Sequence, residues 1–317
     1  MQQEIQYARD WLASGHAIVL VVVSKTWGSA PRPVGSLMII HANGQFEGSV
    51  SGGCIEGTVI LEAESLMGQT ASKTLKFSIA NKDAWQIGLA CGGEIQIQLF
   101  PLGPQNAITF EQTLTAYEER RNGELVLNKS SDTAEFRANE SKGPTRSPIF
   151  DDENSTILPI TPKPALFIVG AVHIAQALIP MAQACDYTVT VIDPRGLFVK
   201  ERHFSGAKLV QDWPDEFFKI NSLDANTAVA TLTHDPKIDD AALLEALKSD
   251  AFYIGSLGSK KTHAERIDRL KAKGFNEKQL ARVHGPIGLN IGSRSAAEIA
   301  ISILAQMIAV KRDANAI

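Results

Sequence analysis

The 317-residue chain has little of several features that define protein classes. Its three cysteines are too few, and odd in number, for a disulfide framework, so they fit a reducing cytoplasm. Its net charge is −4, and no run of Lys and Arg provides an electrostatic footprint for nucleic acid. The longest apolar run near the N-terminus, 17–23, is far shorter than the ~20 residues that span a bilayer, and no basic region typical of a signal peptide precedes it. The sequence therefore predicts a cytoplasmic protein that binds neither nucleic acid nor membrane.

What is present indicates an ordinary globular protein with two domains. Hydrophobic residues make up 44% of the chain and charged residues 21%, which is well clear of the compositions that stay disordered. Single hydrophobic cores stop growing at roughly 250 to 300 residues, so a chain of this length favours two cores.

Residues 1–127 mix helical and strand periodicities and are predicted to form a small α+β domain. The dipeptide Asn43-Gly44 is a strong hairpin signal between two of the strands. The helices are expected near 5–13, 54–67 and 107–121, and the strands near 17–24, 36–41, 45–50 and 94–100.

The remaining chain divides into a polar segment and a second domain. Residues 128–163 are rich in Ser, Asn, Asp, Glu, Lys and Pro without a sustained period, and they are predicted to be an interdomain linker. From residue 164 to 317, short apolar strands alternate with helices, which predicts a Rossmann-like, doubly wound parallel sheet.

The turn at 170–175 has part of a dinucleotide-binding pattern. Such a turn needs glycines so that its amides can approach a pyrophosphate at the start of a helix. Gly170 is present, but Val172 occupies the second glycine position, and His173 follows it. Asp193 ends the next strand, where an acidic residue would bind ribose hydroxyls or, alternatively, cap the turn that follows. Gly170, His173 and Asp193 are therefore candidate ligand residues.

Cys54 stands at the start of a predicted helix and follows Ser51, Gly52 and Gly53. Unpaired amides and the helix dipole favour negative charge at such a position. The motif predicts a reactive thiol or an anion site for a phosphate-bearing cofactor. The alternative is a small buried hydrophobic residue beside a tight turn.

Cys91 is the mirror case, because Gly92 and Gly93 follow it and lead into a strand. It could converge with Cys54 on one soft-metal or cofactor site, but two cysteines are too few for a structural zinc. Cys185, on the apolar stripe of a helix, is predicted to be a core residue.

Two charged residues flank the Cys54 motif. Arg32 lies between prolines in a glycine-bounded loop and could clamp an anion or be an ordinary surface arginine. Glu56, early in the predicted helix, could be an acid, a base or a hydrogen-bond partner of a pterin, or it could complement the helix dipole.

Together these segments resemble the XdhC/CoxI family across nearly the whole chain. Many motifs in one order make the resemblance specific. Two departures are Val172, where the family usually has glycine, and Ser295-Ala296-Ala297, where a proline is usual. The matching segments are 28–35, 48–56, 90–94, 167–175, 193–195, 233–235, 253–259, 286–292 and 298–300.

The resemblance implies an accessory protein and not a catalyst. It implies that the protein binds molybdenum cofactor, supports its sulfuration and inserts it into a xanthine dehydrogenase-like molybdenum hydroxylase. A homodimer and contacts with a cysteine desulfurase and the hydroxylase apoenzyme are also implied. Our hypothesis is that Cys54 and the glycine amides around it hold the cofactor while the Rossmann-like domain closes over it. The alternatives are an NAD(P)-dependent oxidoreductase and a non-catalytic scaffold for hydroxylase assembly.

Overall fold

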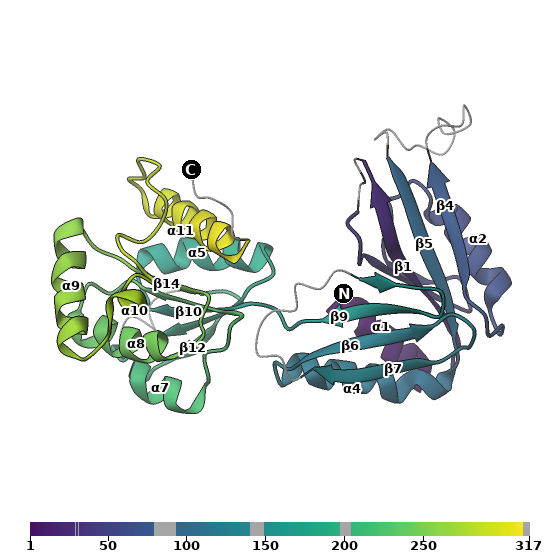
Figure 1. Cartoon of the computed structure of the whole chain (residues 1–317), viewed down its shortest axis with the longest axis horizontal. Coiled ribbons are helices and arrows are strands. Elements are labelled where there is room, and N and C mark those ends of the chain that lie inside the picture. Colours follow the sequence, from purple (N-terminus) through teal and green to yellow (C-terminus); the bar gives the residue numbers. More distant parts are fainter. Residues whose placement is uncertain (29, 31, 79–92, 140–148, 197–203, 313–317) are drawn as a thin grey trace. The chain divides into compact units, whose positions relative to one another are not determined.

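The computed structural model in Figure 1 describes residues 1–28, 30, 32–78, 93–139, 149–196 and 204–312. The chain divides into two compact units, Met1–Pro162 and Lys163–Ile317. Each unit has its own hydrophobic cores. Among the described helices, none is both long enough and apolar enough to cross a bilayer.

The first unit is built on a five-stranded antiparallel sheet with the order β3-β2-β1-β5-β4. Because side chains alternate along a strand, the central strand β1 supplies two cores at once. Ile18, Leu20 and Val22 pack with helices α1 (Gln2–Ala13) and α4 (Ala107–Glu118), whereas the residues between them pack against α2 (Glu56–Leu66). The strands are β1 (Ile18–Trp27), β2 (Leu37–His41), β3 (Phe46–Gly48), β4 (Lys73–Ser78) and β5 (Glu94–Leu102).

The strand pairing brings several predicted motifs to one end of this sheet. Trp27 at the end of β1 and Ser78 at the end of β4 both pair with Glu94 at the start of β5. At the same end β2 begins, and Gly48 closes β3 opposite Met38. We call this the motif end of the sheet, because segments 28–36 and 49–55 both depart from it.

Strand β1 contains one irregularity close to the motif end. Its register with β5 shifts between Val23, opposite Ile97, and Lys25, opposite Gln96. One extra residue on β1, Ser24, is therefore accommodated as a β-bulge. Beyond the bulge, Lys25 and Trp27 lie on the sheet face of Gln96.

A four-stranded sheet with the order β7-β6-β9-β8 completes the first unit. Its strands are β6 (Asn122–Asn128), β7 (Ala134–Asn139), β8 (Phe150–Asp151) and β9 (Ser155–Ile160). The prediction of an interdomain linker over 128–163 is therefore wrong for the described part of that segment. Every second residue of β9 is buried, and Leu158 and Ile160 enter the core with α1 and α4. The sequence conceals this pattern, because the buried residue Thr156 is polar whereas Ile157 and Pro159, at the alternate positions, are not.

The second unit confirms the predicted Rossmann-like fold. Its six strands are all parallel in the order β12-β11-β10-β13-β14-β15. The strand order reverses between β10 and β13, which is the topological switch point of the sheet. One face packs with α5 (His173–Ala184) and α11 (Ala296–Lys311). The other face packs with α7 (Pro214–Ile220), α8 (Pro236–Lys248), α9 (Lys260–Ala272) and α10 (Glu277–Leu280). The strands are β10 (Ala165–Val169), β11 (Thr188–Ile192), β12 (Lys208–Val210), β13 (Thr227–Thr231), β14 (Tyr253–Ser256) and β15 (Val283–His284).

Cys185 does not lie in the core of this unit, contrary to the prediction. It is the exposed residue that directly follows α5. The buried stripe of the helix ends at Ala182, one turn earlier. Extending the apolar period by three residues past that point caused the error.

Candidate functional site

The loop between β3 and α2, residues 49–55, is organised around the carboxylate of Glu56. This side chain is only 7% exposed. Its Oε1 accepts hydrogen bonds from the Ser49 hydroxyl (2.7 Å) and the Ser51 amide (2.9 Å). Its Oε2 accepts from the Gly53 amide (3.0 Å) and from the Ser51 hydroxyl. Amides of two further loop residues donate to the same carboxylate at 3.2 Å.

These contacts keep Glu56 ionised. Burial by itself raises the pKa of a carboxyl group, but the hydrogen bonds from Ser51 and Ser49 outweigh it and lower the pKa of Glu56 to about 2. The charge also lies in the first turn of α2, where it complements the helix dipole. The positive end of α2 therefore already faces a fixed negative charge.

The loop amides have acceptors within the loop itself. Gly52 donates to the Ser49 hydroxyl (2.9 Å), and Cys54 donates to the Ser51 hydroxyl (3.0 Å). With the Glu56 bonds, every amide from residue 50 to residue 55 is satisfied. An anion would have to displace the carboxylate or the serine hydroxyls in order to reach these amides. The glycine amides therefore give the anion-cradle hypothesis no support in this arrangement.

The glycines are needed for the path of the backbone. Gly52 has φ of +78° and Gly53 has φ of +111°, which is a region that side chains rarely tolerate. A Cβ at either position would meet no atom within 4 Å. The two glycines thus permit the turn that closes the loop on Glu56, and crowding is not the reason for them.

Cys54 is held at the turn where this loop meets α2. Its side chain is partly buried against the core between the five-stranded sheet and α2. Arg32 reaches the same loop, because its Nε donates to the Ser49 carbonyl at 3.3 Å. The structure therefore brings Arg32, Cys54 and Glu56 together at the motif end, from segments that are separate in the sequence.

The second cysteine motif cannot be placed in the same way. Cys91 and Gly92 lie outside the described residues, and Gly93 directly precedes β5 at the motif end. Convergence of Cys91 with Cys54 stays a prediction. Within the described ranges, no group of three or more His, Cys, Asp and Glu side chains is arranged to hold a metal ion.

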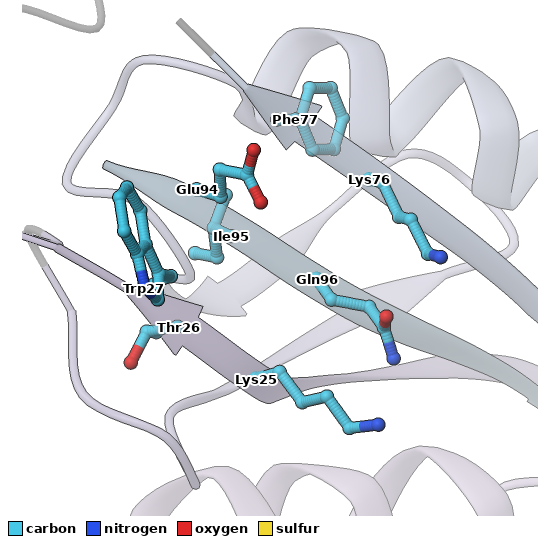
Figure 2. A pocket seen from close by; sticks show the side chains of 8 residues that line it. All are labelled: Lys25, Thr26, Trp27, Lys76, Phe77, Glu94, Ile95 and Gln96. Atoms are coloured by element: carbon cyan, nitrogen blue, oxygen red, sulfur yellow. The ribbon is translucent and has the colours of Figure 1, made fainter. Parts of the chain in front are cut away.

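A groove of about 620 Å³ lies at the motif end. Figure 2 shows the side chains that line it. Sequence analysis did not identify it, because its lining depends on cross-strand neighbours that only the register brings together. The residues that line it are Lys25, Thr26, Trp27, Lys76, Phe77, Glu94, Ile95 and Gln96. We call it the Trp27 groove.

In the second unit, the glycine turn that follows β10 is hydrogen-bonded to Asp193, the acidic residue that follows β11. Asp193 is fully buried, and its Oδ2 accepts a hydrogen bond from the Ala171 amide at 2.8 Å. Arg195 donates to both carboxylate oxygens, through Nε (2.9 Å) and Nη2 (2.8 Å), and its amide donates to Oδ1 (2.9 Å). Burial raises the pKa of Asp193, but these bonds outweigh it and lower that pKa. The carboxylate thus caps the following turn, and binding ribose hydroxyls would require it to exchange these partners.

Gly170 and His173 lie on either side of the glycine turn between β10 and α5. Gly170 has φ of +116°, and a Cβ there would come within 2.7 Å of Thr233 Cγ2. His173 begins α5 with an exposed ring whose Nδ1 is 3.2 Å from Gln176 Oε1. The three candidate residues of this unit are therefore close to one turn, where Asp193 is buried and His173 faces solvent.

A buried polar cluster in the second unit was missed by sequence analysis. Asp239 in α8 is 2% exposed and accepts hydrogen bonds from the Thr233 hydroxyl (2.6 Å) and amide (3.3 Å). Burial raises its pKa. Arg266 in α9, also 2% exposed, donates through Nη2 to the Leu257 carbonyl at 2.7 Å. The helical spacing in the sequence could have predicted that both residues are buried, since Asp239 and Arg266 each lie four residues before a buried leucine of the same helix.

These features define a class of protein: an antiparallel α+β unit with a cysteine loop at one sheet end, followed by a Rossmann-like unit. Two family models match the chain. The model described as the XdhC and CoxI family matches residues 11–78, and the model described as the XdhC Rossmann domain matches residues 166–307. The chain belongs to the XdhC/CoxI family.

Individual relatives match at low identity over almost the whole chain. The molybdenum cofactor insertion chaperone PaoD of Escherichia coli is 27% identical, over 97% of this chain and 87% of its own. A probable xanthine dehydrogenase subunit of Bacillus subtilis is 25% identical, over 93% of both chains. A crystal structure from Bacillus halodurans, described as a xanthine dehydrogenase, superposes with a TM-score of 0.76 at 24% identity, over 98% of this chain and 96% of the other. That structural likeness shows the shared fold.

Proposed function

We propose that this protein binds molybdenum cofactor and inserts it into a xanthine dehydrogenase-like molybdenum hydroxylase. The observation that carries the proposal is the loop at 49–55, which Glu56 holds so that Cys54 is presented at the start of α2. Similarity to an insertion chaperone over 97% of the chain supports it. As a member of the XdhC/CoxI family, the protein is an accessory protein related to that chaperone.

The residues at the motif end suit this cofactor in one respect and not in another. The cofactor is a pterin that carries a phosphate and binds molybdenum through two sulfur atoms. A thiol is the type of soft ligand that suits such a metal, and Cys54 supplies one. The loop amides are already bonded to Glu56 or to the hydroxyls of Ser49 and Ser51, so we assign the loop the task of fixing Cys54 in position. Arg32 contributes by tying the neighbouring segment to the Ser49 carbonyl.

The finer parts of the proposal follow from the family resemblance. They are support of cofactor sulfuration, contact with a cysteine desulfurase, a homodimer and a cytoplasmic location. Each is open to a direct measurement, such as co-purification with the desulfurase or light scattering. The proposed insertion function stands without them.

Binding of the released cofactor tests the proposal. The purified protein is mixed anaerobically with molybdenum cofactor released from a molybdoenzyme, separated by gel filtration and assayed for molybdenum and pterin fluorescence. We expect co-elution with the wild type and a loss of at least tenfold in Cys54→Ala. Cys185→Ala is the matched control, because Cys185 is an exposed cysteine of the other unit and should behave as the wild type.

Activation of a cofactor-free hydroxylase provides a second readout. The wild type and Cys185→Ala should restore its activity when loaded with cofactor, and Cys54→Ala should not. Failure of the wild type to retain cofactor would refute the proposal. Equal retention and equal activation by Cys54→Ala would remove Cys54 from it.

A further inference from the structure

Two lysines of the Trp27 groove flank one glutamine across three adjacent strands. Lys25 on β1 and Lys76 on β4 both pair with Gln96 on β5. Directly opposed residues project on the same face of a sheet, and neighbouring strands lie ~4.8 Å apart. The ammonium groups of Lys25 and Lys76 can therefore both contact one small anion that lies above Gln96.

Within the ranges that the structure describes, neither lysine pairs with a carboxylate. Both side chains are exposed, and no ion pair joins either of them to an acidic group in the described part of the chain. Asp151 lies near Gln96, 3.5 Å from its amide nitrogen, but pairs with Lys129 at 2.7 Å. Among the described residues that line the groove, Glu94 is the acidic one. The lysine end of the groove is thus positively charged.

The other end of the groove offers a flat aromatic surface beside an acceptor. Trp27 pairs with Glu94 across the strands and is 73% exposed, which is unusual for so large an apolar side chain. Figure 2 shows Trp27 and Glu94 together at this end, with Gln96 and the two lysines farther along the strands. An indole provides a stacking surface for a planar ring, and a carboxylate accepts hydrogen bonds from ring N–H groups.

We propose that the Trp27 groove binds a planar nitrogen heterocycle that carries a phosphate group. The ring lies against Trp27 with its N–H donors toward Glu94, and the phosphate lies between Lys25 and Lys76. Trp27 with Glu94 and Lys25 with Gln96 form two rows about 7 Å apart, because residues i and i+2 of a strand are separated by two rises of ~3.4 Å each. This spacing suits a phosphate joined to the ring by a short chain. The identification of the heterocycle as the pterin of molybdenum cofactor rests on the proposed function.

Tryptophan fluorescence tests the groove without using the whole cofactor. The probes are 6-hydroxymethylpterin and its monophosphate, titrated into the wild type and into Trp27→Phe. We expect the monophosphate to quench the wild type and to bind at least tenfold more tightly than the unphosphorylated pterin. The quenching should be largely lost in Trp27→Phe. Equal affinity for the two probes would overturn the assignment of the phosphate.

The double variant Lys25→Ala/Lys76→Ala tests the lysine pair. It should bind the monophosphate at least tenfold more weakly and leave the affinity for unphosphorylated pterin unchanged. Both side chains are exposed, so the fold should be retained, which circular dichroism checks. Lys73→Ala is the matched control, since Lys73 lies on the same strand three residues away and pairs with Glu62. Unchanged monophosphate binding in the double variant would overturn the inference.

Gel filtration with the released cofactor separates this inference from the proposed function. If the wild type retains cofactor and Lys25→Ala/Lys76→Ala retains it equally, the groove inference fails and the insertion function stands. If the wild type retains no cofactor but binds pterin monophosphate through the lysines, the insertion function fails and the groove stands. Loss of cofactor in the double variant supports both.

Discussion

The carboxylate of Glu56 accepts a hydrogen bond from the amide of Gly53, three residues before it, at 3.0 Å. This bond has the three-residue spacing of the backward bond in a capping box. It anchors a loop whose remaining amides also find acceptors in Glu56 and in two serines. The cysteine at the end of the loop is thus positioned by a buried charge.

Replacing that charge should destabilise the protein at neutral pH. Glu56→Gln retains one acceptor oxygen but replaces the other by a donor that faces amide hydrogens. We expect a loss of about 2 to 3 kcal/mol in the free energy of unfolding, since hydrogen bonds to charged groups contribute ~1.5–3 kcal/mol. Urea unfolding at pH 7 measures it. Glu64→Gln, an exposed substitution in the same helix, should change stability by less than ~0.5 kcal/mol.

The pH dependence of this effect has a definite sign. The folded pKa of Glu56 is about 2, below its ordinary value of 4.5, so the stabilisation is present above pH 4.5 and is lost as the pH falls toward 2. The difference between wild type and Glu56→Gln should therefore shrink as the pH falls through this window. A difference that stays constant would contradict the buried-acceptor role.

Asp239 should behave in the opposite way. Burial raises its pKa, so the stability of the folded state falls as the pH rises from the unfolded value of 3.8 through the folded pKa. Asp239→Asn keeps an oxygen for the Thr233 hydroxyl and carries no charge. We expect this variant to be at least as stable as the wild type at pH 7, with the wild type gaining relative to it as the pH falls toward 3.8. Asp240→Asn, which breaks an ion pair with Arg269, should cost less than ~1 kcal/mol at pH 7 and serves as the neighbouring control.

Alanine at Gly170 should be strongly unfavourable. Its φ of +116° is strained for any side chain, and the new Cβ would come within 2.7 Å of Thr233 Cγ2. We expect a loss of about 2 to 4 kcal/mol, from ~1–3 kcal/mol of backbone strain plus the clash. Gly274→Ala shares the positive φ but has no atom within 4 Å of the Cβ, so it should cost only about 1 kcal/mol. Equal losses in thermal or urea unfolding would show that the contact with Thr233 is unimportant.

NAD and NADP should not stabilise the protein against heat. Both carboxylate oxygens of Asp193 are bonded to Arg195 or to the Ala171 amide, and Val172 replaces the second glycine of the dinucleotide pattern. A ligand at 100 times its Kd would add ~2.7 kcal/mol, which a melting experiment detects readily. A clear rise in Tm with either dinucleotide, abolished by His173→Ala or by Asp193→Asn, would restore the oxidoreductase alternative.

Parts of this molecule could be predicted from sequence because their signals are local. Alternating apolar strands and helices indicate the Rossmann-like unit, and Asn43-Gly44 marks the turn between β2 and β3. The second sheet of the first unit was mistaken for a linker because β7 and β8 leave their residues exposed or only partly buried. The residues of this sheet that are buried pack against helices that are distant in the sequence.

The sequence identified residues of the candidate site but not how they are hydrogen-bonded. Gly52, Gly53 and Cys54 stand out in the sequence as a glycine-flanked cysteine, which predicts amides open to a ligand, whereas in the structure these amides are bonded within the loop. The backward hydrogen bond from the Gly53 amide to Glu56 has the spacing of a capping box, but Gly53 lacks the N-cap hydroxyl that marks this motif in a sequence. The Trp27 groove could not be found in this way, because the pairing of Lys25 and Lys76 with Gln96 depends on register.

The bulge at Ser24 decides which way the end of β1 faces. If the strand ran regularly through this residue, Ser24 would stand opposite Gln96, and Lys25 would stand opposite Ile95 on the face that packs against α2. The bulge instead gives Ser24 and Lys25 the same partner, and the buried Ser24 hydroxyl accepts a hydrogen bond from the Gln96 side chain at 3.1 Å. Deleting Ser24 would therefore straighten the strand and still leave Lys25 opposite Gln96. At position 24 this strand can therefore lose one residue without moving Lys25 to the face of the sheet that packs against α2.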